Sequence, residues 1–60
     1  MELDRKNFRA RAEECRQRAA EMRVLAEQVA TPSLRPEYLQ IAGQYDNMAA
    51  QLERMAKMPI

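Results

Sequence analysis

Apolar residues recur along the first half of the chain at alternating spacings of four and three residues. They begin with Phe8, end with Val29, and form two rows with a seven-residue period. Such a heptad pattern predicts a helix that packs lengthwise against another helix. The two rows are Phe8, Cys15, Met22 and Val29, and Ala12, Ala19 and Ala26.

The first helix is predicted to span about residues 4–30. Asp4 is a good N-cap residue, and Glu2 and Asp4 place negative charge at the positive end of the helix dipole. Residues 5–30 contain no glycine and no proline and are mostly strong helix formers.

A break is predicted at residues 31–36, because Pro32 and Pro36 disfavour helical backbone at the residues before them. Two residues could serve as the N-cap of the second helix. Thr31 can cap it with Pro32 in the first position, or Ser33 can cap it with Pro36 in the first turn. We favour Ser33, since the first turn does not use the N–H group that Pro36 lacks.

The second helix is then predicted over about residues 33–57, with Pro59 ending it. Its large apolar residues repeat the spacing of the first helix, so we expect them to face that helix. Pairing residues whose numbers add to 67 centres the hairpin on the break and gives six layers. These layers are Val29–Tyr38, Ala26–Ile41, Met22–Tyr45, Ala19–Met48, Cys15–Leu52 and Ala12–Met55.

A row of three alanines lies beside this seam in the second helix, and three branched residues near the break add apolar surface. An apolar stripe wider than one seam is typical of a bundle helix. Residues 1–60 are therefore predicted to form one all-α domain, an antiparallel two-helix hairpin that pairs into a four-helix bundle, with a C2 homodimer favoured. The residues predicted to mediate association are Val24, Leu25, Leu39, Ala42, Ala49 and Ala56.

Length and composition favour association. Sixty residues bury a small core, and chains of this size often need a disulfide, a metal ion or a partner. One cysteine excludes an intramolecular disulfide, and without histidine the chain lacks the ligands of a structural zinc site. We expect no metal and no cofactor.

Charge and hydropathy limit the expected binding partners and cellular location of the protein. Ten basic and nine acidic residues give a formal net charge of +1, which argues against a dominant nucleic-acid interface. No apolar run reaches the roughly 18 residues of a membrane span, and the start of the chain has no secretory signal pattern. With a single cysteine, a reducing compartment fits, and we expect a cytoplasmic protein.

Cys15 is the one candidate nucleophile in the sequence. Nearby arginines could lower the pKa of its thiol. However, the residue lies in the predicted seam and the chain has no histidine to act as a base. We interpret Cys15 as a buried structural thiol, with a reactive or disulfide-forming thiol as the alternative, and we expect no enzymatic activity.

Three arginines, Arg9, Arg16 and Arg23, form a row with heptad spacing. We interpret them as covering the seam with their aliphatic stems and pairing with acidic residues across the assembly. The alternative is a surface that faces an anionic partner, either nucleic acid or an acidic protein. Intervening glutamates would weaken phosphate binding.

Short stretches of both helices and of the break share a further pattern. They are residues 12–16 (Ala-Glu-Glu-Cys-Arg), residues 25–27 (Leu-Ala-Glu), Thr31-Pro32 with Arg35, and Tyr38-Leu39 with Ala42, Tyr45, Ala49, Leu52 and Glu53. Together, over about residues 8–54, they resemble a family of short helical-hairpin proteins of alphaproteobacteria. The resemblance implies two helices joined by a proline-containing break. That family has no established activity, so the resemblance implies none.

The pattern as a whole predicts a non-enzymatic, self-associating hairpin that serves as a small scaffold or protein-interaction module. The alternative is a small regulator, inhibitor or adaptor that docks on another macromolecule. Binding of nucleic acid through the arginine row is the weakest of the three hypotheses.

Overall fold

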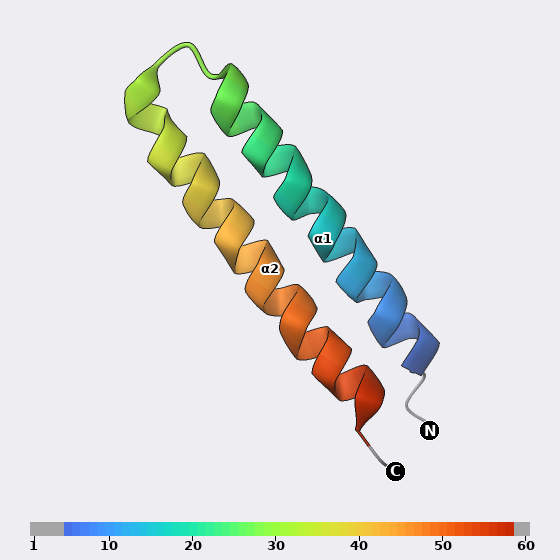
Figure 1. The fold of residues 1–60 in the computed structure, drawn as a ribbon. Helices are drawn as coiled ribbons and strands as arrows, with labels where there is room; N and C mark the ends of the chain where they lie inside the picture. The colour runs from blue at the N-terminus through green and yellow to red at the C-terminus, as the bar shows by residue number, and fades with distance from the viewer. Residues whose placement is uncertain (1–4, 59–60) are drawn as a thin grey trace.

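The chain folds into two antiparallel α-helices, as described by a computed structural model for residues 5–58. Helix α1 spans Arg5–Gln28, a 3-10 helix η1 spans Pro32–Leu34, and α2 spans Arg35–Lys57. The helices lie side by side along their length, so that the start of α1 and the end of α2 share one end of the molecule (Figure 1). The predicted all-α helical hairpin is confirmed.

Pro32 and Pro36, the two prolines of the connection, each lie at the start of a helix. Thr31 is extended and precedes Pro32, which occupies the first turn of η1. The Leu34 N–H donates a hydrogen bond of 3.0 Å to the Thr31 carbonyl oxygen. Pro36 lies in the first turn of α2, where its missing donor has no intrahelical partner to lose.

The predicted cap of the second helix is wrong. Leu34, with helical backbone, precedes α2 and makes no side-chain capping bond, whereas Ser33 lies within η1. The 3-10 turn leads directly into α2 and leaves no extended residue at Ser33 to act as an N-cap. At the other end, α2 stops at Lys57, as predicted, and Met58 is extended, the conformation favoured before a proline. The predicted roles of Glu2, Asp4 and Pro59 fall outside the described residues.

The interior of the hairpin is made of alanine. Among the described residues, six side chains are at most 2% exposed, and all six belong to alanines. They form one row of three on each helix, with members seven positions apart, so that small side chains meet along the contact. The six are Ala12, Ala19, Ala26, Ala42, Ala49 and Ala56.

The predicted seam is confirmed for the alanine row of α1 and wrong for one of its two rows on α2. Its remaining members on both helices, such as Cys15 and Leu52, are half-buried. The alanine row of α1 is buried as expected. On α2, however, the buried row is the alanine row, and the three residues that each precede one of these alanines are 39–45% exposed: Ile41, Met48 and Met55. One residue corresponds to a rotation of about 100° around the helix. Alanine opposite alanine allows the two backbones to approach more closely than alanine opposite methionine or isoleucine would.

Candidate interaction surface

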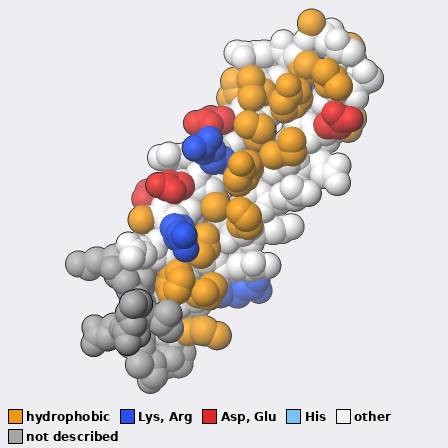
Figure 2. All heavy atoms as spheres, turned by 180° about the vertical axis from the view of Figure 1, so that it is seen from behind, with side chains coloured by type: hydrophobic (Ala, Val, Ile, Leu, Met, Phe, Trp, Pro, Cys, Tyr) orange, Lys and Arg blue, Asp and Glu red, His pale blue; other side chains and the backbone are white. Residues whose placement is uncertain are grey.

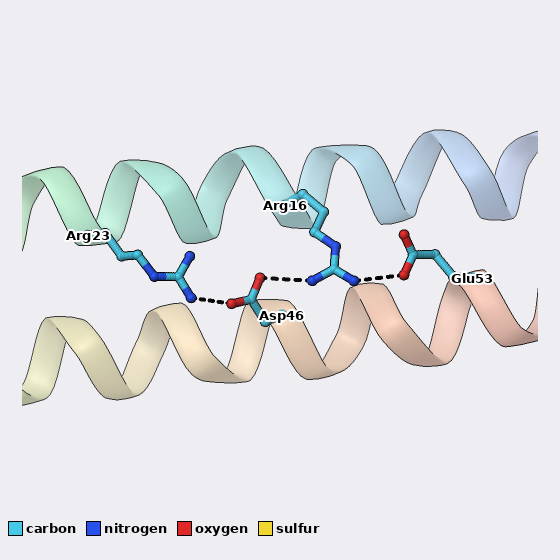
Figure 3. Close-up of polar contacts among 4 residues, drawn as sticks. All are labelled: Arg16, Arg23, Asp46 and Glu53. Carbon is cyan, nitrogen blue, oxygen red and sulfur yellow. Dashed lines mark hydrogen bonds and ion pairs between the residues drawn. The ribbon is translucent and has the colours of Figure 1, made fainter.

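One flank of the hairpin is closed by ion pairs between the helices. Arg16 donates from Nη1 to Asp46 Oδ1 at 3.2 Å and from Nη2 to Glu53 Oε1 at 2.7 Å. Arg23 donates to the other carboxylate oxygen of Asp46 (Figure 3). Both basic residues follow an α1 alanine by four positions, and both acidic residues follow an α2 alanine by four positions. The burial of the alanine rows therefore places these side chains opposite one another.

The charges on this flank support each other's ionised state. The hydrogen bond from Arg23 lowers the pKa of the Asp46 carboxyl group, and Arg16 adds to this effect. The hydrogen bond to Glu53 raises the pKa of the Arg16 guanidinium. Because the four side chains are 27–50% exposed, solvent screens the pairs and their contribution to stability is modest.

This flank accounts for two members of the predicted arginine row. Arg16 and Arg23 pair with acidic residues of their own chain, where the sequence interpretation placed the acids across an assembly. Arg9 is exposed and forms no ion pair with a residue that the structure describes. An anionic partner would have to compete with the carboxylates of Asp46 and Glu53.

The opposite flank is apolar, and no ion pair between residues that the structure describes joins the helices there. On this flank, α1 contributes the half-buried residues Phe8, Cys15 and Met22. Helix α2 contributes two half-buried residues, Tyr45 and Leu52, and the exposed row of Ile41, Met48 and Met55. Figure 2 shows apolar side chains in a stripe that runs along both helices, with charged side chains on its edges. We name this surface the apolar face; it consists of Phe8, Cys15, Met22, Ile41, Tyr45, Met48, Leu52 and Met55.

A shallow groove of about 400 Å³ lies on the apolar face between the helices. It places Cys15 of α1 next to Met48, Leu52 and Met55 of α2, which shows that the two rows share one flank. Its rim is polar and includes Arg11 and Glu14, and Gln51 completes the lining. Cys15 is half-buried in this groove, whereas the sequence predicted a buried thiol between the helices.

The structure does not gather the six residues predicted to mediate association. The three alanines among them, Ala42, Ala49 and Ala56, are enclosed between the helices of the same chain, so they cannot meet a partner while the hairpin is closed. This corrects their assignment to an outer surface. The physical reason is that they, and not the larger residues beside them, form the contact with α1.

The other three, Val24, Leu25 and Leu39, are 42–48% exposed but point to different sides. Val24 is about 200° around α1 from Ala26 and so faces away from α2. Leu39 borders a second hollow next to Arg23, on the ion-paired flank. Leu25, one residue before Ala26, is the one that lies on the flank of the apolar face.

Comparison with known proteins assigns neither a family nor a function to the chain. No family model, no curated protein and no solved structure matches the chain. The resemblance to the alphaproteobacterial hairpin proteins stays a prediction.

Two further properties of residues 5–58 bear on this surface. Neither described helix is long and apolar enough to cross a membrane. In the same residues, no three carboxylate or thiol groups come together in a way that could hold a metal ion. The apolar face is the surface whose large apolar side chains the chain's own contacts leave open.

Proposed function

We propose that the protein is a non-enzymatic, self-associating helical hairpin that acts as a small scaffold or interaction module. One observation carries this proposal. Among the described residues only alanines are fully enclosed, while a row of larger apolar side chains on α2, Ile41, Met48 and Met55, remains exposed on one face.

The energetic reason is the small size of the alanine side chain. A buried methyl or methylene group contributes about 0.8 kcal/mol, whereas fixing the backbone of one residue costs about 1–2 kcal/mol. Half-buried Tyr45 and Leu52 add to the interior, but no large side chain of the described residues is enclosed. A partner that covers the apolar face would supply the missing burial.

A four-helix bundle is the assembly that this shape favours. Each helix of a bundle contacts two neighbours, and each therefore needs apolar positions on two adjacent sides. In α2 the alanine row meets α1, and the row of Ile41, Met48 and Met55 lies about 100° away, where a second neighbour would pack. C2 pairing of two hairpins would provide that neighbour.

Sedimentation velocity and circular dichroism over a dilution series test the proposal. We expect a species of twice the 7.0 kDa chain mass at micromolar concentration, and helix content that falls as the dimer dissociates. A stable, fully helical monomer across the series would contradict self-association. A chain that is poorly helical alone at every concentration would instead favour docking on another macromolecule.

A further inference from the structure

We propose that a second copy of the chain covers the apolar face with like helix against like helix. In this arrangement α2 packs antiparallel on α2 of the second copy, and α1 packs antiparallel on α1. The inference rests on the proposed self-association and adds to it the surface and the orientation of the occupant.

The size of the face suits a second hairpin. The molecule extends 47 Å by 15 Å by 13 Å between its outermost Cα atoms, so a broad face covers roughly 700 Å². Each partner in a standard-size protein interface contributes about 800 Å². An identical hairpin also has the same length and the same seven-residue spacing, as interlocking side chains require.

The two helices present different chemistry along the outer edges of this face. The edge on α2 is the apolar row of Ile41, Met48 and Met55. The edge on α1 is charged, and its acidic and basic side chains alternate along the stripe (Figure 2). Two of these side chains line the groove, and the other two lie seven residues further along α1: Arg11 and Glu14, then Arg18 and Glu21.

This charged edge is complementary to itself. When two copies of α1 lie antiparallel, Arg11 of one chain faces Glu21 of the other, and Glu14 faces Arg18. Each of the four side chains therefore lies opposite an unlike charge. All four residues are exposed, and none forms an ion pair with another described residue. The four are therefore available for pairing between chains.

The other way of stacking two hairpins is less favourable. It would place α1 against α2 of the second copy, so that Arg11 and Arg18 would face Met48 and Met55. Charged groups would then lose water without gaining an opposite charge. Like-on-like stacking keeps the methionines together and the ion pairs at the rim, and the net charge of +1 offers little repulsion between copies.

The first experiment places a charge on the face. Met48→Glu introduces a carboxylate into the apolar edge, and we expect the dissociation constant of the dimer to rise by at least about tenfold. The matched control is Val24→Glu, because Val24 is 48% exposed, compared with 45% for Met48, but faces away from α2. We expect the control to change the constant by less than about twofold.

The outcomes of this first experiment distinguish an error in the assigned interface from a failure of self-association itself. A dimeric wild type whose Met48→Glu variant associates with unchanged affinity would overturn the apolar face as the interface and leave self-association standing. A wild type that is a folded monomer would overturn both. A dimer weakened equally by Val24→Glu would also contradict the assigned face.

The second experiment tests the like-on-like orientation. The variant Arg11→Glu/Arg18→Glu makes the edge of α1 wholly acidic, and Glu14→Arg/Glu21→Arg makes it wholly basic. Each should self-associate more weakly than the wild type, because like charges face each other. An equimolar mixture should form the heterodimer in preference to either homodimer, as measured by native mass spectrometry.

A second pair of variants controls for net charge alone. Arg54→Glu/Lys57→Glu and Glu13→Arg/Glu27→Arg change the charge by the same amounts at exposed positions away from the edge. At physiological salt, where the screening length is about 8 Å, we expect this mixture to show no preference. Equal preference in both mixtures, or none in the first, would overturn the like-on-like orientation.

Discussion

Arg16 donates a hydrogen bond of 2.7 Å to Glu53, across the two helices and between residues 37 positions apart in the sequence. Arg16 follows Ala12 by four residues, and Glu53 follows Ala49 by four. The pair can form because the alanine rows, and not the methionine row of α2, face each other. The same rotation of α2 creates the ion-paired flank and exposes the apolar face.

Replacing Gly43 by alanine should stabilise the protein. Gly43 lies within α2, and a Cβ atom added there would meet nothing within 4 Å in the hairpin. Alanine is favoured over glycine in a helix interior by about 0.5–1 kcal/mol. We expect urea unfolding to show a gain of this size. A loss of stability would mean that a neighbour outside the hairpin approaches Gly43 closely.

Enlarging a buried alanine should destabilise the hairpin. Ala19 is fully buried, so Ala19→Leu would force the helices apart and should lower the free energy of unfolding by about 1–3 kcal/mol. The control is Ala20→Leu at the next, exposed position, where we expect a change within about 0.5 kcal/mol. Urea denaturation of both variants measures the difference. Equal stability of the two would contradict the alanine contact.

Loss of the Arg35 side chain should weaken the turn. Its Nε donates a hydrogen bond of 3.1 Å to the carbonyl oxygen of Ala26, in the last turn of α1, where carbonyl groups lack intrahelical partners. Arg35→Ala should lower the free energy of unfolding by about 1 kcal/mol. Arg54→Ala, at an exposed position of α2, serves as the control and should have a smaller effect. Thermal melts of the two variants should therefore differ.

The ion-paired flank should make stability depend on acid pH. Because the pKa of Asp46 in the folded chain is lower than its ordinary value of 3.8, its ionised form favours folding above that pH. This contribution is lost as the pH falls through the lower, folded value. Asp46→Asn should therefore melt slightly below the wild type at pH 7, and the difference should vanish at the acid end of the titration. A constant difference from neutral to strongly acid pH would be inconsistent with these ion pairs.

Much of the fold could be predicted from the sequence. The absence of glycine and proline from residues 5–30 and the prolines at residues 32 and 36 predicted two helices and a break, and the heptad spacing predicted the alanine row of α1. The side of α2 that faces α1 could not be predicted from spacing alone. Ile41 and Ala42 each begin a row of three with a seven-residue period, and the greater hydrophobicity of the first row favoured the wrong choice.

The same ambiguity hid the candidate surface. The size and hydrophobicity of Met48 and Met55 favour the interior, which leaves the alanines as the predicted outer surface, but the structure buries the alanines and exposes both methionines. A signal that could have resolved it was the position of Asp46 and Glu53. Their seven-residue separation matches that of Arg16 and Arg23, and pairing the two sets requires the alanine rows to face each other.

We propose that this hairpin becomes stable by covering its apolar face with a second copy. Sedimentation equilibrium of the unmodified chain, with helix content measured on the same samples, tests it most directly. We expect a monomer–dimer equilibrium at micromolar concentration, with the helical signal following the dimer fraction. A single species of 7.0 kDa that keeps its full helical signal on dilution would contradict the claim.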